Sequence, residues 1–351
     1  MTGSINHVQL AALRAERRQH GENWFRNNYN RDRRGVADFI RWMRDKRGLW
    51  PAPKRFPVDR PDSNWLAVNR SDSTLTWIGH VTFLFQHRGL NVLTDPVFSE
   101  RASPLSFVGP KRYTPPAMHV DHLPPIDIVL ISHNHYDHLD RDAVRHIARR
   151  NEGRTRFLVP LRLAGWFRRE GIDNVVELDW WDETLPLGEK PGSVGRNKVY
   201  AWFVPAQHFS GRGVNDRNAT LWGGWVLEID GFRLYFAGDT GYGKDFADIG
   251  AVFGGFDLSL IPIGAYEPQW LMGSVHVNPE DAVRIHRDVK SKHSIGMHWG
   301  TFILTDEPVD EPPRRLARAR SDQGLADGDF VVMRHGEVRR WSPGCVPGYN
   351  L

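Results

Sequence analysis

The sequence has a single cysteine, Cys345, among its 351 residues. One thiol excludes a disulfide within the chain and a zinc site built from thiolates, so metal ligands would have to be His, Asp or Glu. There is no apolar stretch of about eighteen residues, the length needed to cross a bilayer as a helix. The first 21 residues also lack the apolar run of a secretory signal. We therefore expect a protein of the reducing cytoplasm.

The charge balance is close to neutral, with a net charge of +4 that comes mostly from arginine. An excess this small fits an ordinary solvated surface, and it also fits contact with an anionic partner such as a phospholipid. We expect no nucleic-acid partner. The sequence leaves open whether two copies of the chain form a homodimer.

Residues 1–70 differ from the rest of the chain, because they are polar and arginine-rich. Between Val36 and Met43 the apolar residues fall near helical spacing, with arginines on other faces. This segment is either a short helix packed on the main domain or a basic amphipathic helix that rests on a lipid surface. We expect residues 1–70 to form a basic extension that packs on or beside a main domain of residues 71–351.

Residues 71–351 alternate short apolar strands with helices, which predicts packed sheets with helices outside. We expect hairpins at Arg88-Gly89 and Asp230-Gly231 and a helix that begins at Asn278-Pro279. Near the end of the chain, Phe330–Met333 and Val338–Trp341 are expected to pair as strands.

A proline-rich loop is predicted between Phe98 and Pro125. It holds three basic residues, Arg101, Lys111 and Arg112, which either meet a phosphate or are ordinary solvated charges.

The densest cluster of metal-capable side chains reads H-x-H-x-D-H, from His133 to His138. Neutral imidazole and carboxylate suit zinc or iron. A catalytic zinc takes three protein ligands and a water, so four candidates in so short a stretch, with more downstream, favour two metals.

Four apolar strands each lead to a residue of this kind. A lone histidine after a strand is usually structural, but four such strand ends predict a metal site at one edge of the sheets. The strands and the residues that follow them are Ile126–Ile131 with His133, Val199–Val204 with His208, Arg233–Ala237 with Asp239, and Ser294–Met297 with His298.

The first metal would be held by His133, His135 and His208. His133 and His135 are two positions apart, so in extended backbone their side chains point the same way. This set of three is called the first group below.

The second metal would be held by Asp137, His138 and His298, the second group, because Asp137 and His138 lie beyond a turn. Asp239 has two carboxylate oxygens and can bridge both ions. Two cations roughly 3.5–4 Å apart would share a hydroxide of raised acidity, which is then the nucleophile.

Ligating histidine rings donate their second N–H to a supporting partner. Asp95 and Asp140 are candidates for that role, and His80 is expected near the floor of the site. Each of these three is also open to a purely structural interpretation.

The H-x-H-x-D-H motif, His208, the Gly-Asp-Thr-Gly around Asp239, and His298 resemble the metallo-β-lactamase superfamily. Within it, residues 74–340 are similar to the family of N-acyl phosphatidylethanolamine-hydrolysing phospholipases D. Two narrower strings carry that second resemblance, namely Gly264-Ala265-Tyr266-Glu267-Pro268 and His298-Trp299-Gly300-Thr301.

The resemblance implies an α+β fold, a four-layer αββα sandwich with a dinuclear metal site at one edge, for a hydrolase domain of residues 71–351. It implies two divalent cations, with zinc expected and iron or manganese as alternatives, on the seven residues of the two groups and Asp239. It also marks three catalytic residues, Asp137, Asp239 and His276.

The implied reaction is hydrolysis of N-acyl phosphatidylethanolamine to phosphatidic acid and an N-acylethanolamine, with attack of the metal-bound hydroxide in line at phosphorus. His276 would hydrogen-bond a phosphoryl oxygen, and Asp239 or a water that it holds would protonate the leaving alkoxide. The expected partner is a phospholipid or another small phosphodiester, with peripheral contact at the inner face of a membrane.

Two alternatives stay open. The same scaffold and metals serve lactonases, sugar-phosphate lactonases and β-lactamases, from which only the shape of the substrate groove distinguishes a phospholipase. A non-catalytic scaffold that binds lipid or nucleic acid is the second alternative. Scaffolds of that kind usually lose ligands, whereas all seven positions are filled here.

Overall fold

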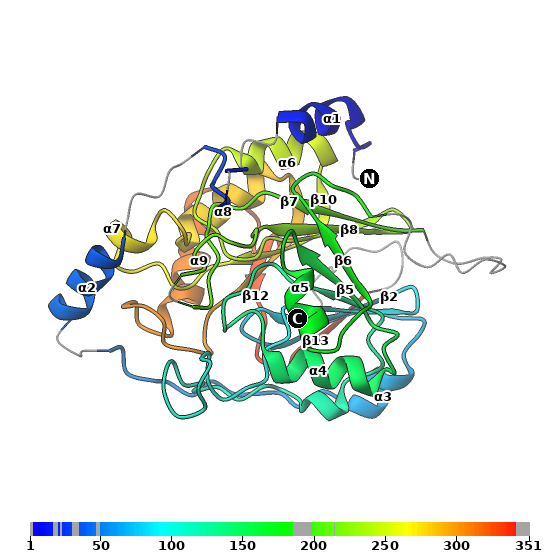
Figure 1. Ribbon diagram of the computed structural model, residues 1–351, viewed down its shortest axis with the longest axis horizontal. Coiled ribbons are helices and arrows are strands. Elements are labelled where there is room, and N and C mark those ends of the chain that lie inside the picture. Colours follow the sequence, from blue (N-terminus) through cyan, green and yellow to red (C-terminus); the bar gives the residue numbers. More distant parts are fainter. Residues whose placement is uncertain are drawn as a thin grey trace.

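Two β-sheets lie face to face at the centre of the molecule, and helices cover their outer faces (Figure 1). The computed structural model describes residues 3–16, 20–21, 23–29, 35–46, 50–184, 198–213 and 215–341. Cys345 lies outside these residues. The αββα sandwich expected from the sequence is confirmed.

The first sheet has seven strands in the order β13-β1-β2-β3-β4-β5-β6. The strands β13, β1, β2 and β3 are antiparallel neighbours, and β3 to β6 run parallel. Arg88 and Gly89 both have positive φ, at 52° and 77°, which builds the predicted tight hairpin between β2 and β3. The bounds are β1 (Ser73–Gly79), β2 (Thr82–His87), β3 (Leu90–Thr94), β4 (Ile128–Leu130), β5 (Arg156–Pro160), β6 (Val175–Leu178) and β13 (Val338–Trp341).

The second sheet has six strands in the order β12-β11-β10-β9-β8-β7. The predicted hairpin at Asp230-Gly231 joins β8 to β9, and β9 to β12 are parallel neighbours. The bounds are β7 (Val199–Val204), β8 (Gly224–Ile229), β9 (Phe232–Phe236), β10 (Phe256–Pro262), β11 (Ser291–Met297) and β12 (Phe330–Val332).

Helices on the two outer faces complete the four layers, with α1 and α6 at the top of Figure 1 and α3 and α4 at the bottom. The predicted helix at Asn278-Pro279 is α8, and the Asn278 side chain accepts a hydrogen bond from Asp281 N at 2.8 Å. The bounds are α1 (His7–Glu16), α2 (Val36–Asp45), α3 (Ser63–Val68), η1 (Val120–His122), α4 (Arg141–Arg150), α5 (Ala164–Arg169), α6 (Asp245–Phe253), α7 (Gln269–Met272), α8 (Pro279–Asp288) and α9 (Glu311–Asp322).

Large aromatic side chains fill the space between the sheets. Trp77, Phe83 and Phe85 from the first sheet meet Phe203 and Trp225 from the second in one continuous core. Strands β1 and β10 are buried along their whole length, and the polar residues in them, such as Thr76 and Ser259, are buried together with the apolar ones. The core holds the ends of the strands in fixed positions, and the site is built on those ends.

The prediction that the last two strands pair with each other is wrong. Strand β12 pairs in parallel with β11 in the second sheet, whereas β13 pairs antiparallel with β1 in the first. Gly336, at φ 84°, turns the chain from one sheet to the other, and a Cβ there would lie 1.8 Å from Asp59 O. In the sequence, the short polar link between the two strands looks like a hairpin turn. The sequence does not show that each strand instead joins the edge of a different sheet.

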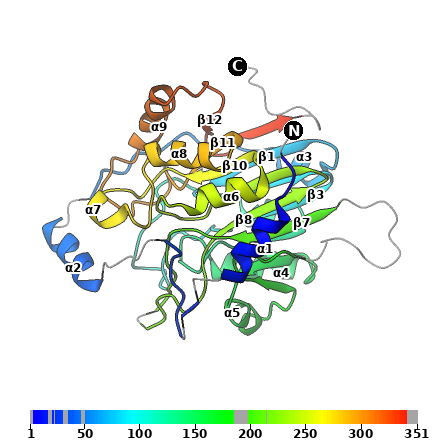
Figure 2. The ribbon, with the colours of Figure 1, turned by 90° about the horizontal axis from the view of Figure 1, so that it is seen from above.

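The described residues before position 70 pack on the sandwich at several points. Helix α1 lies over α6, with Asn6 N donating to Val252 O at 2.7 Å. Helix α2 lies beside α7 (Figure 2), where the Arg41 guanidinium is 5.4 Å from the ring of Trp270. The domain boundary at residue 70 stays a prediction. In the described part of the chain, no helix has both the length and the apolar character needed to cross a membrane.

Candidate metal centre

The first group assembles as the sequence predicted. His133 Nε2 lies 2.8 Å from His135 Nδ1, and His208 Nε2 lies 3.3 Å from the same His135 atom. One nitrogen from each of the three rings falls within 4.8 Å of the other two. The ring nitrogens therefore converge on one point, although His208 is more than seventy positions away in the chain.

The second group assembles next to it. Asp137 Oδ2 lies 3.3 Å from His298 Nε2 and 3.6 Å from His138 Nε2. His80 joins this set, with its Nε2 at 3.1 Å from the same carboxylate oxygen. His80 therefore lies within the site, as the sequence interpretation expected.

Asp239 lies between the two groups. Its Oδ2 is 3.0 Å from His138 Nε2 and 3.2 Å from His298 Nε2, and it is 3.9 Å from His208 Nε2 in the first group. His276 Nδ1 is also 3.9 Å from this oxygen. One carboxylate thus reaches both clusters, as a bridging ligand would have to do.

Backbone geometry at two positions lets these strand ends come together. Gly238, directly before Asp239, has φ 65°, and a Cβ there would lie 2.8 Å from the Cβ of Ser132. His298 also has a positive φ, at 62°, and its N–H donates to His80 O at 3.1 Å. A positive φ in a non-glycine residue costs free energy, and such strain tends to occur at functional sites.

Asp95 supports the ring of His138. Its Oδ2 accepts from His138 Nδ1 at 2.7 Å, and its Oδ1 accepts from Ser132 N at 2.7 Å. This bond directs the other ring nitrogen, Nε2, toward Asp239. Asp95 therefore lies where the sequence interpretation placed a supporting carboxylate.

Asp140 does not support a ligand ring. Its Oδ1 accepts from Asp142 N and Ala143 N at the start of α4, and its Oδ2 accepts from Phe98 N and Ser99 N. It is a helix cap that also anchors the loop that begins at Phe98. The motif places it close to the site in sequence, but the turn after His138 directs its side chain away.

Burial and charge divide the site into neutral rings and ionised carboxylates. Burial lowers the pKa of His135 to about 4 and the pKa values of His133 and His208 well below their usual range, so these rings have free lone pairs at neutral pH. For Asp239, burial favours the neutral form, but His138 and His298 outweigh it and hold the pKa well below its usual range.

His298 shows the opposite balance. Burial lowers its pKa, but the carboxylates of Asp239 and Asp137 outweigh burial and raise the pKa to about 9. A cation at this position would take over the role of the ring proton, because ligating imidazole has to be neutral.

The site fits metal ions on the geometry of its polar atoms. His138 Nε2, His298 Nε2 and Asp239 Oδ1 are buried and have no hydrogen-bond partner among the described residues. The short distances from these two ring nitrogens to Asp239 Oδ2 are therefore not aligned hydrogen bonds. Buried polar atoms without partners cost roughly 1–3 kcal/mol each. Cations would satisfy all of these atoms, and imidazole with carboxylate is a donor set suited to zinc or iron.

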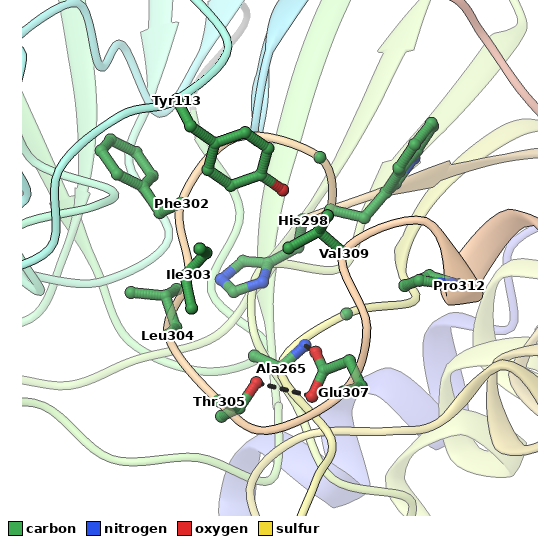
Figure 3. Close-up of a pocket in the computed structure, with 13 residues that line it drawn as sticks. Tyr113, Ala265, His298, Phe302, Ile303, Leu304, Thr305, Glu307, Val309 and Pro312 are labelled. Carbon is green, nitrogen blue, oxygen red and sulfur yellow. Dashed lines mark hydrogen bonds between the residues drawn. The ribbon is translucent and has the colours of Figure 1, made fainter. Parts of the chain in front are cut away.

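A small pocket is lined in part by His298 (Figure 3). Its floor is a loop held by Glu307, whose carboxylate accepts from Ala265 N at 2.6 Å and Thr305 Oγ at 2.7 Å. Its wall includes Tyr113 and Phe302.

A larger groove of about 840 Å³ shares Tyr113, Ile303 and Leu304 with that pocket. Its other wall comes from α2 and the chain after it, with Phe39, Trp42, Met43 and Trp50. The sequence interpretation did not find this groove. The amphipathic pattern of α2 was a partial signal, but a pattern does not show what a helix faces.

Each of the three basic loop residues has a partner in or beside the loop. Arg112 is buried and donates to Ser99 O at 3.2 Å and Val97 O at 2.8 Å. Lys111 pairs with Glu100, and Arg101 donates to Gly109 O. These side chains mainly hold the loop together.

Comparisons with known proteins agree with this fold and site. A family model described as the beta-lactamase superfamily domain matches residues 90–299. The N-acyl-phosphatidylethanolamine-hydrolyzing phospholipase D 1 of Caenorhabditis elegans is 44% identical over 274 residues, which cover 75% of this chain and 74% of that protein. The mitochondrial N-acyl-phosphatidylethanolamine-hydrolyzing phospholipase D of Saccharomyces cerevisiae is 37% identical over 256 residues, covering 72% of this chain and 53% of that one.

Among solved structures, a metallo hydrolase from the archaeon Ignicoccus hospitalis superimposes with a TM-score of 0.54 at 24% identity, covering 78% of this chain and 99% of that chain. A likeness at this identity concerns the fold alone. Taken with the family match and the convergent histidines and carboxylates, these findings show that the chain belongs to the β-lactamase superfamily and is a metal-dependent hydrolase.

Proposed function

We propose that this protein is a phospholipase D-type phosphodiesterase that hydrolyses N-acyl phosphatidylethanolamine to phosphatidic acid and an N-acylethanolamine. We further propose that the first group, the second group and Asp239 hold two divalent cations, with zinc preferred over iron or manganese. One observation carries the choice of a lipid: a large apolar groove meets the wall of the pocket beside His298. The names of the worm and yeast relatives support the same substrate.

Two divalent cations, when bound, would supply positive charge that stabilises the phosphate and makes water acidic. The protein's own part is to orient the groups around them. The Asp239 carboxylate is ionised, so it cannot itself give a proton to the leaving alkoxide. A water that Asp239 holds is the better proton donor for that step.

His276 is suited to orient the phosphate. Burial lowers the pKa of its ring to about 4, so the ring is neutral at physiological pH. Its Nδ1 is buried and has no hydrogen-bond partner among the described residues, and its side chain is 13% exposed. A neutral ring N–H can donate to a phosphoryl oxygen without adding charge to the site.

The exposed face of α2 supports contact with a lipid surface. Phe39, Ile40 and Met43 are 51%, 59% and 41% exposed, and Arg41 and Arg44 lie beside them. Exposed apolar residues rimmed by basic ones suit the interface of an anionic bilayer. Phe107, 76% exposed, lies in the loop that leads to the groove at Gly109. We propose that this face rests on a membrane while a lipid enters the groove.

A substrate panel on one preparation of known metal content tests the proposal. We expect release of N-acylethanolamine from N-acyl phosphatidylethanolamine in mixed micelles, and no comparable turnover of a lactone or a β-lactam. In ¹⁸O-labelled water the label should enter the phosphate of phosphatidic acid, because attack is at phosphorus. Turnover of the lactone or β-lactam without the phospholipid would overturn the proposal in favour of another hydrolase of this fold.

A further inference from the structure

The side chain of Asn27 lies against the main chain of His208. Asn27 Nδ2 donates to His208 O at 3.0 Å, and His208 N donates to Asn27 Oδ1 at 3.1 Å. The amide thus pairs with both backbone groups of one residue, as a neighbouring strand would. Asn27 Oδ1 also accepts from Trp222 Nε1 at 3.0 Å, and the Trp222 ring is buried.

His208 depends on these bonds because it follows β7 in a loop. No other described residue pairs with its N–H or its C=O. Its ring is fixed separately, since Nδ1 donates to Val275 O at 2.9 Å, which leaves Nε2 to face the first group. Asn27 therefore sets where the backbone of this ligand lies, and Val275 sets how its ring is turned.

The segment that carries Asn27 is attached to the sandwich on both sides of it. Before it, the ring of Phe25 is buried and Phe25 N donates to Asn218 O at 2.9 Å. After it, Asn28 Nδ2 donates to Asp245 Oδ1 at 2.8 Å in α6, and the Tyr29 hydroxyl donates to Asp248 at 2.5 Å. With anchors on either side, the amide of Asn27 has little freedom to move away from His208.

We infer that Asn27 is a positioning residue, through which the N-terminal extension places His208 for the cation of the first group. The inference rests on the proposed two-cation centre but not on the identity of the substrate. The second group has no contact with Asn27 among the described residues, so loss of the amide should affect one cation and spare the other. A merely structural role would lower stability without that selectivity.

The test is cobalt(II) titration of the metal-free full-length protein, followed by its visible absorption, for the wild type and two alanine variants. In Asn27→Ala we expect one of the two cations to bind about 10–100-fold more weakly, the usual effect of losing a supporting group, with a changed spectrum for that ion alone. Asn174→Ala is the control, because it also removes a side-chain amide that donates to main-chain oxygens, those of Gly153 and Arg154, and it takes no part in holding Asn27. We expect it to lower the melting temperature but to leave both affinities within about twofold.

A conservative variant adds a graded outcome. Asn27→Asp keeps an acceptor for His208 N and Trp222 Nε1 but loses the donor to His208 O. Its affinity for the affected cation should therefore fall between those of the wild type and Asn27→Ala. Equal affinities in Asn27→Ala and wild type, or equal weakening of both cations, would overturn the inference. A wild type that binds two cations but leaves N-acyl phosphatidylethanolamine intact would overturn the proposed function alone, and a wild type that binds no cation pair would overturn both.

Discussion

Asp95 Oδ2 lies 2.7 Å from His138 Nδ1, and neither side chain is exposed to solvent. This bond fixes which ring nitrogen of His138 faces Asp239. In Asp95→Asn the charged acceptor is lost, and we expect metal affinity at the second group to fall about 10–100-fold. Isothermal titration with zinc measures this. Asp140→Asn is the control, because Asn still caps α4 and Asp140 touches none of the ligand rings. Equal affinities in both variants would contradict the role of Asp95.

His135 holds the centre of the first group, since both His133 and His208 approach its Nδ1. We expect His135→Ala to abolish hydrolysis and to retain fewer bound metal ions than the wild type, with an unchanged circular dichroism spectrum. Elemental analysis and the micelle assay measure the two effects on one sample. His122→Ala, at an exposed histidine in η1, is the control. Full activity in His135→Ala would contradict the two-cation mechanism.

Much of the site could be predicted because its residues follow strands with strong apolar patterns. The core between the sheets fixes those strands, so side chains just past their ends, such as His133 and Asp239, have only one edge at which to meet. The choice between Asp95 and Asp140 was not available from sequence, because it depends on the direction of one turn after His138.

Three other features could not be predicted, because no motif or periodicity in the sequence indicates them. Asn27 acts on His208 from 181 positions away, and an asparagine in a polar segment has no periodic signal. The groove is formed by residues from α2, the loop at Tyr113 and the stretch at Ile303, which meet only in the folded chain. The sequence predicts that β12 and β13 pair with each other, because they are close in the chain. It does not show that each strand has a free sheet edge to join elsewhere.

The exposed face of α2 gives a prediction about substrate presentation. We expect Phe39→Asp together with Met43→Asp to reduce activity on N-acyl phosphatidylethanolamine in vesicles by about tenfold or more, since each apolar side chain is worth roughly 1–2 kcal/mol at an interface. Activity on a short soluble phosphodiester should change less than twofold. Comparison of kcat/KM on the two substrates measures the difference.

Val8→Asp is the control for this experiment, because Val8 is 82% exposed on α1 and lines no part of the groove. It adds one of the two negative charges that the double variant adds, without touching α2, and should change neither activity. If the double variant lost activity equally on both substrates, the face of α2 would not be a lipid contact.

Asp245 gives a prediction about stability and pH. Burial raises its pKa to about 7 from an ordinary 3.8; the hydrogen bond from Asn28 opposes this and the charge of Asp248 adds to it. Between pH 4 and pH 7 the folded protein therefore keeps a proton that the unfolded chain releases. Stability falls as the pH rises through this window, and the loss is complete above pH 7, at roughly 4 kcal/mol for a shift of about three pKa units.

Asp245→Asn should remove this loss, because the amide is neutral at every pH and its oxygen can still accept from Asn28. We expect the variant to be more stable than the wild type by up to about 4 kcal/mol at pH 8 and nearly equal to it at pH 4, in urea denaturation of metal-free protein. Asp248→Asn, on the same helix, loses a carboxylate that pairs with Tyr29 and removes only a smaller contribution to the raised pKa of Asp245, so its gain with pH should be much smaller. A gain in unfolding free energy of the same size at pH 4 and pH 8 would contradict this prediction. It would mean that the amide packs better than the carboxyl group, and that the proton on Asp245 is not the cause.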